Sequence, residues 1–167
     1  MIDYQVVDNF LDQQDFDNLS NQLLSDTFPL FLQTRINTEN KKGIYFTHVF
    51  KHWEKEDLNC NDSLFNLLKP IITKLNCKQL YRAQLNLHPK TFFKRYNAYH
   101  RDQPVSHKGC LLYLNTNNGN TIIKNGIFGK KFKSIANRAL MFDPSIIHRS
   151  TTCTDKDFRA LLVLNYS

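Results

Sequence analysis

The 167-residue sequence lacks any long run of apolar residues, any internal repeat and any linker or low-complexity segment. No apolar stretch approaches the length that spans a bilayer, so we expect no contact with the membrane interior. The N-terminus has no basic segment followed by an apolar one. We therefore expect no signal peptide and a cytoplasmic location. A chain of this length without a linker predicts one domain, residues 1–167, with a core of its own.

Cysteine is scarce, and no two cysteines form a Cys-x-x-Cys pair. This spacing argues against a zinc site. In a reducing compartment the simplest expectation is four free, mostly buried thiols. They are Cys60, Cys77, Cys110 and Cys153.

Acidic residues are outnumbered by basic ones, 15 to 22, which gives a net charge of +7 and a pI near 9.3. Such a charge permits attraction to nucleic acid or to other anions. A solvated surface with many Lys and Asn residues explains the charge equally simply, and we prefer that interpretation. A hydrophobic content of 41% and a charged content of 22% are those of a globular protein.

The chain divides into an N-terminal support region, residues 1–77, and a strand-rich core, residues 78–167. In the first region, apolar residues at helical spacing predict one helix over 12–24 and another from Asp62 to Leu75. We expect Asp62 to cap the second helix and Pro70 to bend or split it. Two strands and one polar loop are expected around these helices, at 4–7, 45–50 and 33–43.

The core region changes to short strands separated by turns. Asn and Gly residues mark turns at 117–120 and 126–129. A series of short strands after two helices predicts a mainly β fold. The expected fold is a double-stranded β-helix, or jelly roll, with the N-terminal helices packed on its larger sheet. The expected strands cover residues 79–87, 109–115, 121–123, 139–142, 146–151 and 159–166.

The last of these strands is apolar on both faces. Alternation places Ala160, Leu162, Leu164 and Tyr166 on one face and Leu161 and Val163, together with Arg159, on the other. A strand of this kind is covered on both sides. Arg159 would then lie on an inner face, where an unpaired cation is costly.

The triplet His100-Arg101-Asp102 is the first candidate for chemistry. In extended chain His100 and Asp102 share a face, and Arg101 points away. A second His from a distant strand, His148, would complete the set of two His and one carboxylate that binds non-haem Fe(II). The other histidines are expected to have surface or packing roles: His48, His52, His88 and His107.

The segment from about Leu80 to Tyr166 resembles the 2-oxoglutarate and Fe(II)-dependent dioxygenases, specifically their prolyl-4-hydroxylase-like branch. Arg159 follows His148 by eleven positions, as in that family. The resemblance rests on His100-x-Asp102, on the segments 112–117, 119–121 and 138–143, and on His148 and Arg159.

The resemblance implies roles for individual residues. His100, Asp102 and His148 would bind Fe(II), which would be chelated by 2-oxoglutarate and would react with O2; ascorbate is a further expected reductant. Arg159 would bind the far carboxylate of 2-oxoglutarate through its planar guanidinium. Tyr113 would help to hold the same carboxylate, and Asn86 would donate to the cosubstrate. Arg138 and Asp143 are interpreted as structural.

The expected activity is therefore that of an oxidoreductase that hydroxylates a peptidyl residue, proline first, or a small molecule, with release of succinate and CO2. A nucleic-acid demethylase of the same superfamily is an alternative, but those enzymes usually carry a second Arg shortly after the position of Arg159. A non-catalytic jelly-roll binding module is another, but it has no reason to keep the whole metal set. A metal-dependent isomerase or cupin would need a His-rich cluster that is absent.

The substrate itself is not indicated by any motif, and neither is the oligomeric state. Specificity in enzymes of this type comes from loops around the pocket. The candidate loops are residues 33–43, 89–98, which contain aromatic and basic residues, and 124–134.

Overall fold

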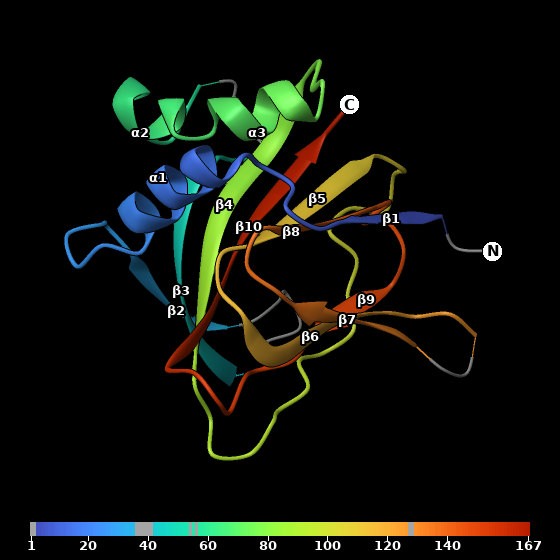
Figure 1. Ribbon diagram of the computed structural model, residues 1–167. Helices are drawn as coiled ribbons and strands as arrows, with labels where there is room; N and C mark the ends of the chain where they lie inside the picture. The colour runs from blue at the N-terminus through green and yellow to red at the C-terminus, as the bar shows by residue number, and fades with distance from the viewer. Residues whose placement is uncertain (1–2, 36–41, 54, 56, 127–128) are drawn as a thin grey trace.

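The computed structural model describes residues 3–35, 42–53, 55, 57–126 and 129–167. Its elements are arranged as Figure 1 shows. In chain order they are β1 (Tyr4–Val7), α1 (Gln13–Leu23), β2 (Phe31–Arg35), β3 (Lys42–Lys51), α2 (Asp62–Asn66), α3 (Lys69–Lys74), β4 (Leu80–Pro89), β5 (Lys108–Tyr113), β6 (Asn117–Ile123), β7 (Lys130–Ser134), β8 (Arg138–Phe142), β9 (His148–Ser150) and β10 (Phe158–Tyr166).

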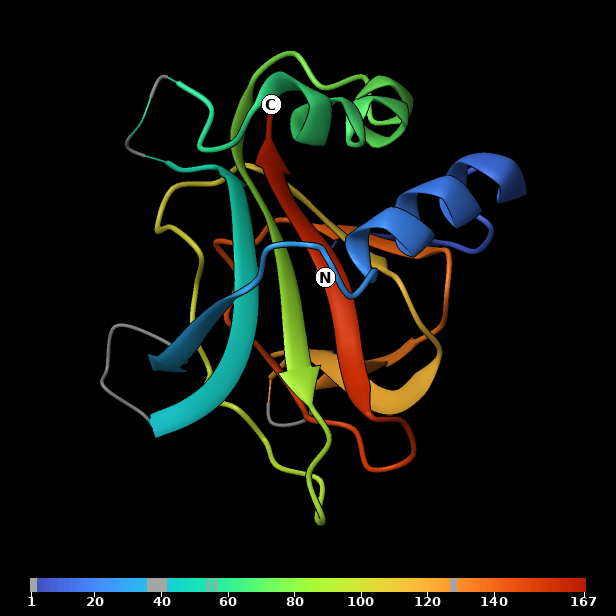
Figure 2. The same ribbon diagram turned by 90° about the vertical axis from the view of Figure 1, so that its left-hand side faces the viewer.

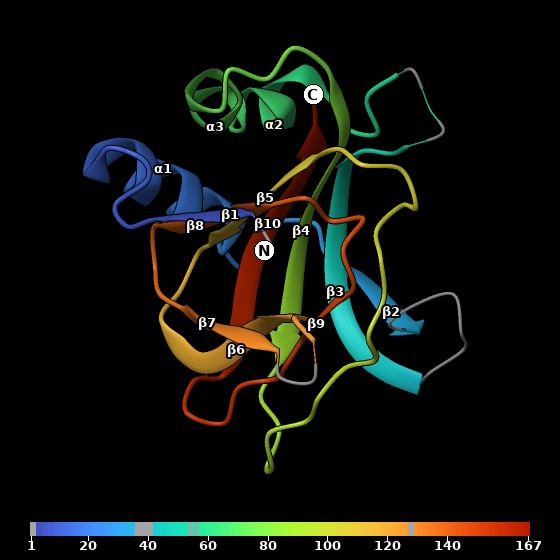
Figure 3. The ribbon, with the colours of Figure 1, turned by 90° about the vertical axis from the view of Figure 1, so that its right-hand side faces the viewer.

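The strands form two sheets. The larger has the order β1-β8-β5-β10-β4-β3-β2, and the smaller has the order β7-β6-β9. Neighbouring strands are antiparallel in both. Figure 3 shows the smaller sheet in front of β10 and β4 of the larger one. Two facing antiparallel sheets with crossovers between them confirm the predicted jelly-roll architecture.

The three helices lie together on the outer side of the larger sheet, as Figures 1 and 2 show. From α1, the buried Phe16, Leu19 and Leu23 join the core beneath the helices. The second predicted helix is split into α2 and α3, and Pro70 lies in the first turn of α3, where its missing N–H costs nothing. Its cap differs from the prediction, because Asn61, not Asp62, accepts the backbone N–H of Leu64 at 3.0 Å.

Strand β10 separates two cores, as its alternation predicted. Its outer side chains pack with those of the helices, and its inner side chains pack with those of β5 and β8 between the sheets. The outer set is Ala160, Leu162, Leu164 and Tyr166, and the inner apolar set is Leu161 and Val163. A continuous apolar run is thus accounted for by cover on both faces.

Two local expectations were wrong, and one strand was not predicted. Residues 33–35 belong to β2 and residues 42–43 to β3, so the polar loop is shorter than predicted; residues 36–41 lie outside the described part. The expected turn at 117–120 is the beginning of β6, where an irregularity in the pairing with β7 absorbs the turn-forming residues. Strand β7 had no counterpart in the prediction because only Phe132 and Ser134 of its residues are buried.

Two other expectations concern cysteines and membranes. The four cysteines are free thiols, as predicted; Cys110 and Cys153 are buried, and Cys60 and Cys77 are partly buried. Among the helices that the structure describes, none has the length and apolar character needed to cross a membrane.

Candidate metal and anion site

Between the sheets lies a cavity of about 540 Å³. Its floor consists of the inner faces of β4 and β10, which are paired with each other, and its wall includes β6 and β9 of the smaller sheet. Every second residue of β4 contributes to the floor, namely Arg82, Gln84, Asn86 and His88. The alternation of this strand therefore places its polar side chains on the side that faces the cavity.

Backbone hydrogen bonds bring the two distant histidines of the predicted metal set together. His100 and His148 form an isolated antiparallel bridge, in which each backbone N–H donates to the carbonyl of the other at 2.9 Å. Their ring centroids are 4.5 Å apart. Two residues later, the N–H of Asp102 donates to the carbonyl of Pro144 at 3.0 Å, which fixes the carboxylate beside the rings.

The three side chains converge on one point. Oδ1 of Asp102 is 3.7 Å from Nε2 of His100 and 3.7 Å from Nε2 of His148. All three candidate ligand atoms lie within 4.8 Å of one another. Donors about 2.1 Å from a common ion are roughly 3 to 3.5 Å apart. A small adjustment would therefore bring the set to metal-binding distances.

The far side of each imidazole is held by the backbone. Nδ1 of His148 is 2.8 Å from the carbonyl of Ile146, and Nδ1 of His100 is 3.3 Å from the carbonyl of Ala98. A proton on Nδ1 leaves the lone pair of Nε2 facing the common point. Burial lowers the pKa of His148, which favours the neutral imidazole that a metal requires.

Asp102 offers one oxygen to this point and has the other fixed by the protein. Its Oδ2 accepts Nδ2–H of Asn165 at 2.9 Å and lies 3.7 Å from Nη1 of Arg82. Burial alone would raise the pKa of Asp102, but the charge of Arg82, the two histidines and the Asn165 hydrogen bond hold it below the ordinary value. The carboxylate is therefore ionised and ready to bind a cation.

Arg159 lies elsewhere in the same cavity and is fully buried, with 0% exposure. Its Nε donates to Oγ of Ser134 at 2.8 Å, and its Nη2 donates to Oγ1 of Thr121 at 3.0 Å. A Cβ at Gly119 would be 2.6 Å from Cδ of Arg159, so only glycine leaves room for this side chain. The hydrogen bonds and the glycine together hold the guanidinium in one place.

The guanidinium of Arg159 has no carboxylate beside it in the described part of the chain, and its Nη1 is buried without a hydrogen-bond partner. Burial lowers the pKa of Arg159, yet an arginine stays protonated in proteins. A buried cation with an unused N–H group is unfavourable unless an anion is supplied from solution. The geometry therefore fits a bound carboxylate.

Tyr113 and Asn86, the other two residues predicted to bind the cosubstrate, differ in their relation to the cavity. The hydroxyl of Tyr113 donates to Oγ1 of Thr121 at 2.8 Å, and Tyr113 is not among the described residues that line the cavity. Asn86 does line it; its Oδ1 accepts from Thr47 and from Gln84, which leaves the amide N–H groups to donate to a ligand. The predicted role of each in cosubstrate binding stays a prediction.

Two residues that line the cavity, His88 and Thr121, and one that contacts Arg159, Ser134, were missed by sequence reasoning. His88 follows Asn86 in the same alternation, so extending the pattern by one step would have identified it. Burial and the neighbouring charge of Arg159 lower the pKa of His88 to about 3, so it is neutral. Thr121 belongs to a segment that carried the resemblance but received no role. Ser134 had no signal, because β7 was not predicted.

Arg138, which was predicted to be structural, pairs with Asp8 through two hydrogen bonds.

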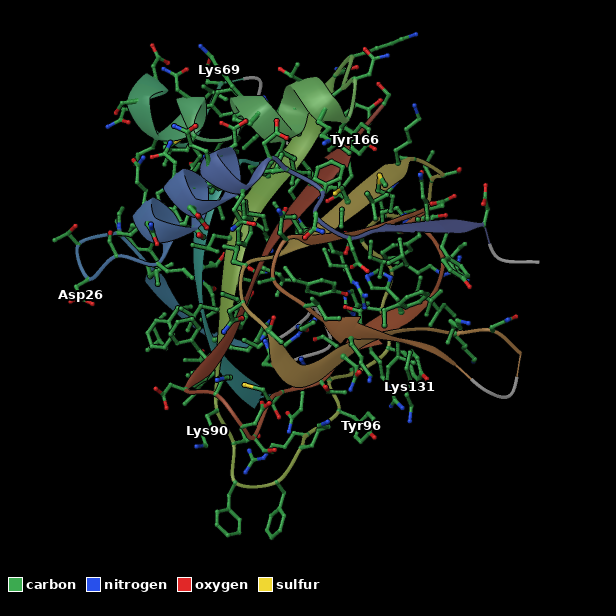
Figure 4. All side chains as sticks on the ribbon, in the orientation of Figure 1. Asp26, Lys69, Lys90, Tyr96, Lys131 and Tyr166 are labelled. Atoms are coloured by element: carbon green, nitrogen blue, oxygen red, sulfur yellow. The ribbon has the colours of Figure 1, made fainter. Side chains whose placement is uncertain are left out.

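The loop 89–98, one of the predicted specificity loops, has exposed aromatic side chains: Phe92 is 89% exposed and Phe93 is 75% exposed. Figure 4 shows Lys90 and Tyr96 at the end of the molecule opposite Tyr166. Residues 127–128 of the third loop lie outside the described part.

The residues present fit Fe(II) and 2-oxoglutarate on two observations. Three potential ligand atoms converge with their outer shell already in place, and a buried guanidinium in the same cavity lacks an anion. The first observation suits a divalent metal ion that keeps coordination positions open for further ligands. The second suits the free carboxylate of a chelating dicarboxylic acid.

No protein-family model matches the sequence, and no curated protein matches it. Solved structures do match the fold. An oxidoreductase of the 2OG-Fe(II) oxygenase family from Burkholderia pseudomallei superposes with a TM-score of 0.72 at 15% identity, covering 98% of this chain and 84% of that one. A prolyl-4-hydroxylase from Pseudomonas putida gives 0.65 at 12% identity, with 99% and 93% covered.

A third structure, of the epimerase SnoN in complex with Fe3+, alpha ketoglutarate and nogalamycin RO, gives a TM-score of 0.64 at 10% identity, with 99% of this chain and 78% of that chain covered. These likenesses extend over nearly the whole chain, including residues 1–77, for which the sequence carried no motif. The chain therefore has the fold of the 2OG-Fe(II) oxygenases, as the resemblance of its C-terminal half predicted.

Proposed function

We propose that this protein is an Fe(II)- and 2-oxoglutarate-dependent dioxygenase. The observation that carries the proposal is the convergence of His100, Asp102 and His148 in a cavity that also holds the unpaired guanidinium of Arg159. Either half alone could be a structural feature. Their occurrence together, in the fold of oxygenases, matches what a metal-chelating dicarboxylate needs.

In this proposal the protein supplies two neutral imidazoles and one carboxylate on one side of the metal. The backbone carbonyls of Ala98 and Ile146 keep both Nε2 atoms free for it. Bound there together with 2-oxoglutarate and O2, Fe(II) supplies the oxidation of a substrate C–H bond, with release of succinate and CO2. The set leaves the remaining coordination positions open for these ligands.

Arg159 binds the far carboxylate of 2-oxoglutarate through its unused Nη1–H group, and Asn86 donates to the same cosubstrate. Thr121 contributes as well: its Oγ1 already accepts from Arg159 and Tyr113, so its own proton can be donated to the carboxylate. Tyr113 acts through Thr121, because its hydroxyl is directed there. The surrounding Leu161 and Leu111 keep the cavity partly apolar, which strengthens these contacts.

For the substrate we propose a peptidyl residue, with proline first, or a small molecule. The support comes from proteins of the same fold, a prolyl-4-hydroxylase and an epimerase that binds nogalamycin RO. None of residues 160–167 is an Arg, so the second Arg shortly after Arg159 that would favour a nucleic-acid demethylase is missing.

The test is succinate formation from 2-oxoglutarate by the full chain with Fe(II) and O2. It is run alone and with proline-containing peptides, free amino acids and single-stranded oligonucleotides, and products are checked for the gain of one oxygen atom by mass. Succinate above the metal-free background is expected without substrate, and a true substrate should increase it. No succinate under any condition would contradict the proposal.

Variants make the test specific to the site. His100→Ala and His148→Ala should each abolish succinate formation and lower Mn²⁺ affinity by more than about 100-fold, because two ligands hold the ion poorly. Lys131→Ala, on the exposed side of β7, serves as a control and should behave as the parent. Full activity in either histidine variant would show that the metal lies elsewhere.

A further inference from the structure

Oδ2 of Asp102, the carboxylate oxygen that faces away from the histidines, is held by side chains with no assigned role. We infer that Asn165 and Arg82 are positioning residues for the metal, with Asn165 itself oriented by His107. This inference rests on the proposed function. It concerns how the carboxylate is held, and the proposed function identifies only which residues hold the metal.

Asn165 is the central member of this group. It is 0% exposed, and its Nδ2 lies 2.9 Å from Oδ2 of Asp102 and 2.9 Å from Nε2 of His107. An amide NH2 group has two hydrogens, so each acceptor receives one. The pair of contacts thus fixes both the position and the orientation of the amide.

The orientation depends on the tautomer of His107, which a second contact determines. Nδ1 of His107 is 2.8 Å from the carbonyl of Val105, so Nδ1 carries the proton and Nε2 accepts from Asn165. Trp53 packs edge-on against the same ring, with centroids 5.1 Å apart. His107 is therefore held in the form that makes Asn165 donate to Asp102.

Arg82 supplies a positive charge from the neighbouring strand β4. It is paired directly with Asn165 in the β4–β10 register, and its Nη1 lies 3.7 Å from Oδ2 of Asp102. Its Nε is a buried donor without a partner, and Oδ1 of Asn165 is a buried acceptor without one. A donor and an acceptor without partners thus lie on directly paired residues, and both residues contact Asp102.

Holding Oδ2 has a direct consequence for Oδ1. A carboxylate that rotates freely offers either oxygen to a cation or chelates it with both, whereas a fixed one presents a single oxygen in one direction. Outer-shell partners of this kind affect metal affinity by about 10- to 100-fold. Removing them should weaken metal binding even though every ligand is still present.

The experiment measures Mn²⁺ and Co²⁺ affinity of the full chain in the absence of 2-oxoglutarate, the visible spectrum of the Co²⁺ form, and the melting temperature without metal. Asn165→Leu, which keeps the shape and removes both donors, should lower affinity by about 10- to 100-fold and alter the Co²⁺ spectrum. His107→Phe, which keeps the ring packing, should lower the affinity for both metals a few-fold. Asn18→Leu, on the exposed face of α1, is the control and should match the parent.

Arg82→Met and Arg82→Lys keep the test decisive if Asn165→Leu fails to fold. Arg82→Met should weaken metal binding, and Arg82→Lys should restore most of the loss because it keeps the charge. Folded Asn165→Leu or Arg82→Met protein with parental affinity and spectrum would overturn the inference. A parent protein that binds neither metal through His100 and His148 would instead overturn the proposed function, and the inference with it.

Discussion

The two ends of the cavity differ in how their charges are balanced. At the metal end, a carboxylate is surrounded by donors from the protein, Asn165 and Arg82 among them. At the anion end, the guanidinium of Arg159 contacts the hydroxyl groups of Ser134 and Thr121 and the ring of Tyr113, and no carboxylate lies beside it in the described part of the chain. The first end is prepared for its ion by the protein's own contacts, while the second keeps a charge that only a ligand can pair.

This difference has an energetic meaning. A buried cation without an anion destabilises the folded chain, and a ligand that pairs with it offsets that cost on binding. At the metal end the ordering cost is paid in advance by packing and hydrogen bonds. Among substitutions at the anion end, we expect replacement of Arg159 itself to change 2-oxoglutarate affinity most and replacement of its supporting residues to change it least.

At the anion end, the largest effect is expected for Arg159→Met. Removing the guanidinium should raise the concentration of 2-oxoglutarate needed for half-maximal succinate formation by about 100-fold, roughly 2 to 3 kcal/mol, because a charge-assisted bond to a buried cation is lost. Mn²⁺ affinity should stay within about twofold of the parent. Loss of metal binding as the first effect would remove the distinction between the two ends.

The same variant has a stability signature. In the parent, 2-oxoglutarate with Mn²⁺ should raise the melting temperature, since ligand binding to the folded state stabilises it. In Arg159→Met this rise should be largely lost, while the ligand-free protein melts at a similar or higher temperature, because a buried unpaired charge has been replaced by an apolar group of similar length. A marked drop in the melting temperature of the ligand-free variant would indicate that Arg159 is chiefly structural.

An intermediate effect is expected from the buried neutral His88. Its folded pKa of about 3 lies below that of a histidine in the unfolded chain, near 6.5, so between these values the unfolded state binds more protons. Stability should therefore fall as the pH is lowered from about 6.5 towards 3. His88→Phe should reduce the slope around pH 5 by up to about 1.4 kcal/mol per pH unit, measured by urea unfolding. If the pH dependence of stability were the same in His88→Phe and in the parent, the pKa of His88 would not be lowered by folding.

The smallest effect is expected for Tyr113→Phe. Because its hydroxyl donates to Thr121 and does not line the cavity, its removal should weaken 2-oxoglutarate binding by less than about fivefold, or roughly 1 kcal/mol. Thr121→Val should weaken 2-oxoglutarate binding more than Tyr113→Phe does, since it removes the acceptor for Arg159 as well as the proposed donor to the ligand. The reverse order would mean that Tyr113 contacts the carboxylate directly.

Much of the fold could be predicted because its signals are local. Alternation in β10 placed Arg159 on an inner face, and helical spacing located α1 and the split pair α2 and α3. The errors fell where local signals mislead. Turn-forming residues at 117–120 are accommodated within a strand, and the mostly exposed β7 lacks the apolar residues that would mark it.

The sequence by itself determined the two-faced strand β10 with a cation on its inner face, which follows from strand period. It also predicted the set His100, Asp102 and His148 as metal ligands, from residue type and from the family resemblance. Only the tertiary structure decided that Asn165 and Arg82 hold Asp102 and that Tyr113 contacts Thr121. Period tells which face a side chain takes, but the atoms that it meets come from strands far away in the chain.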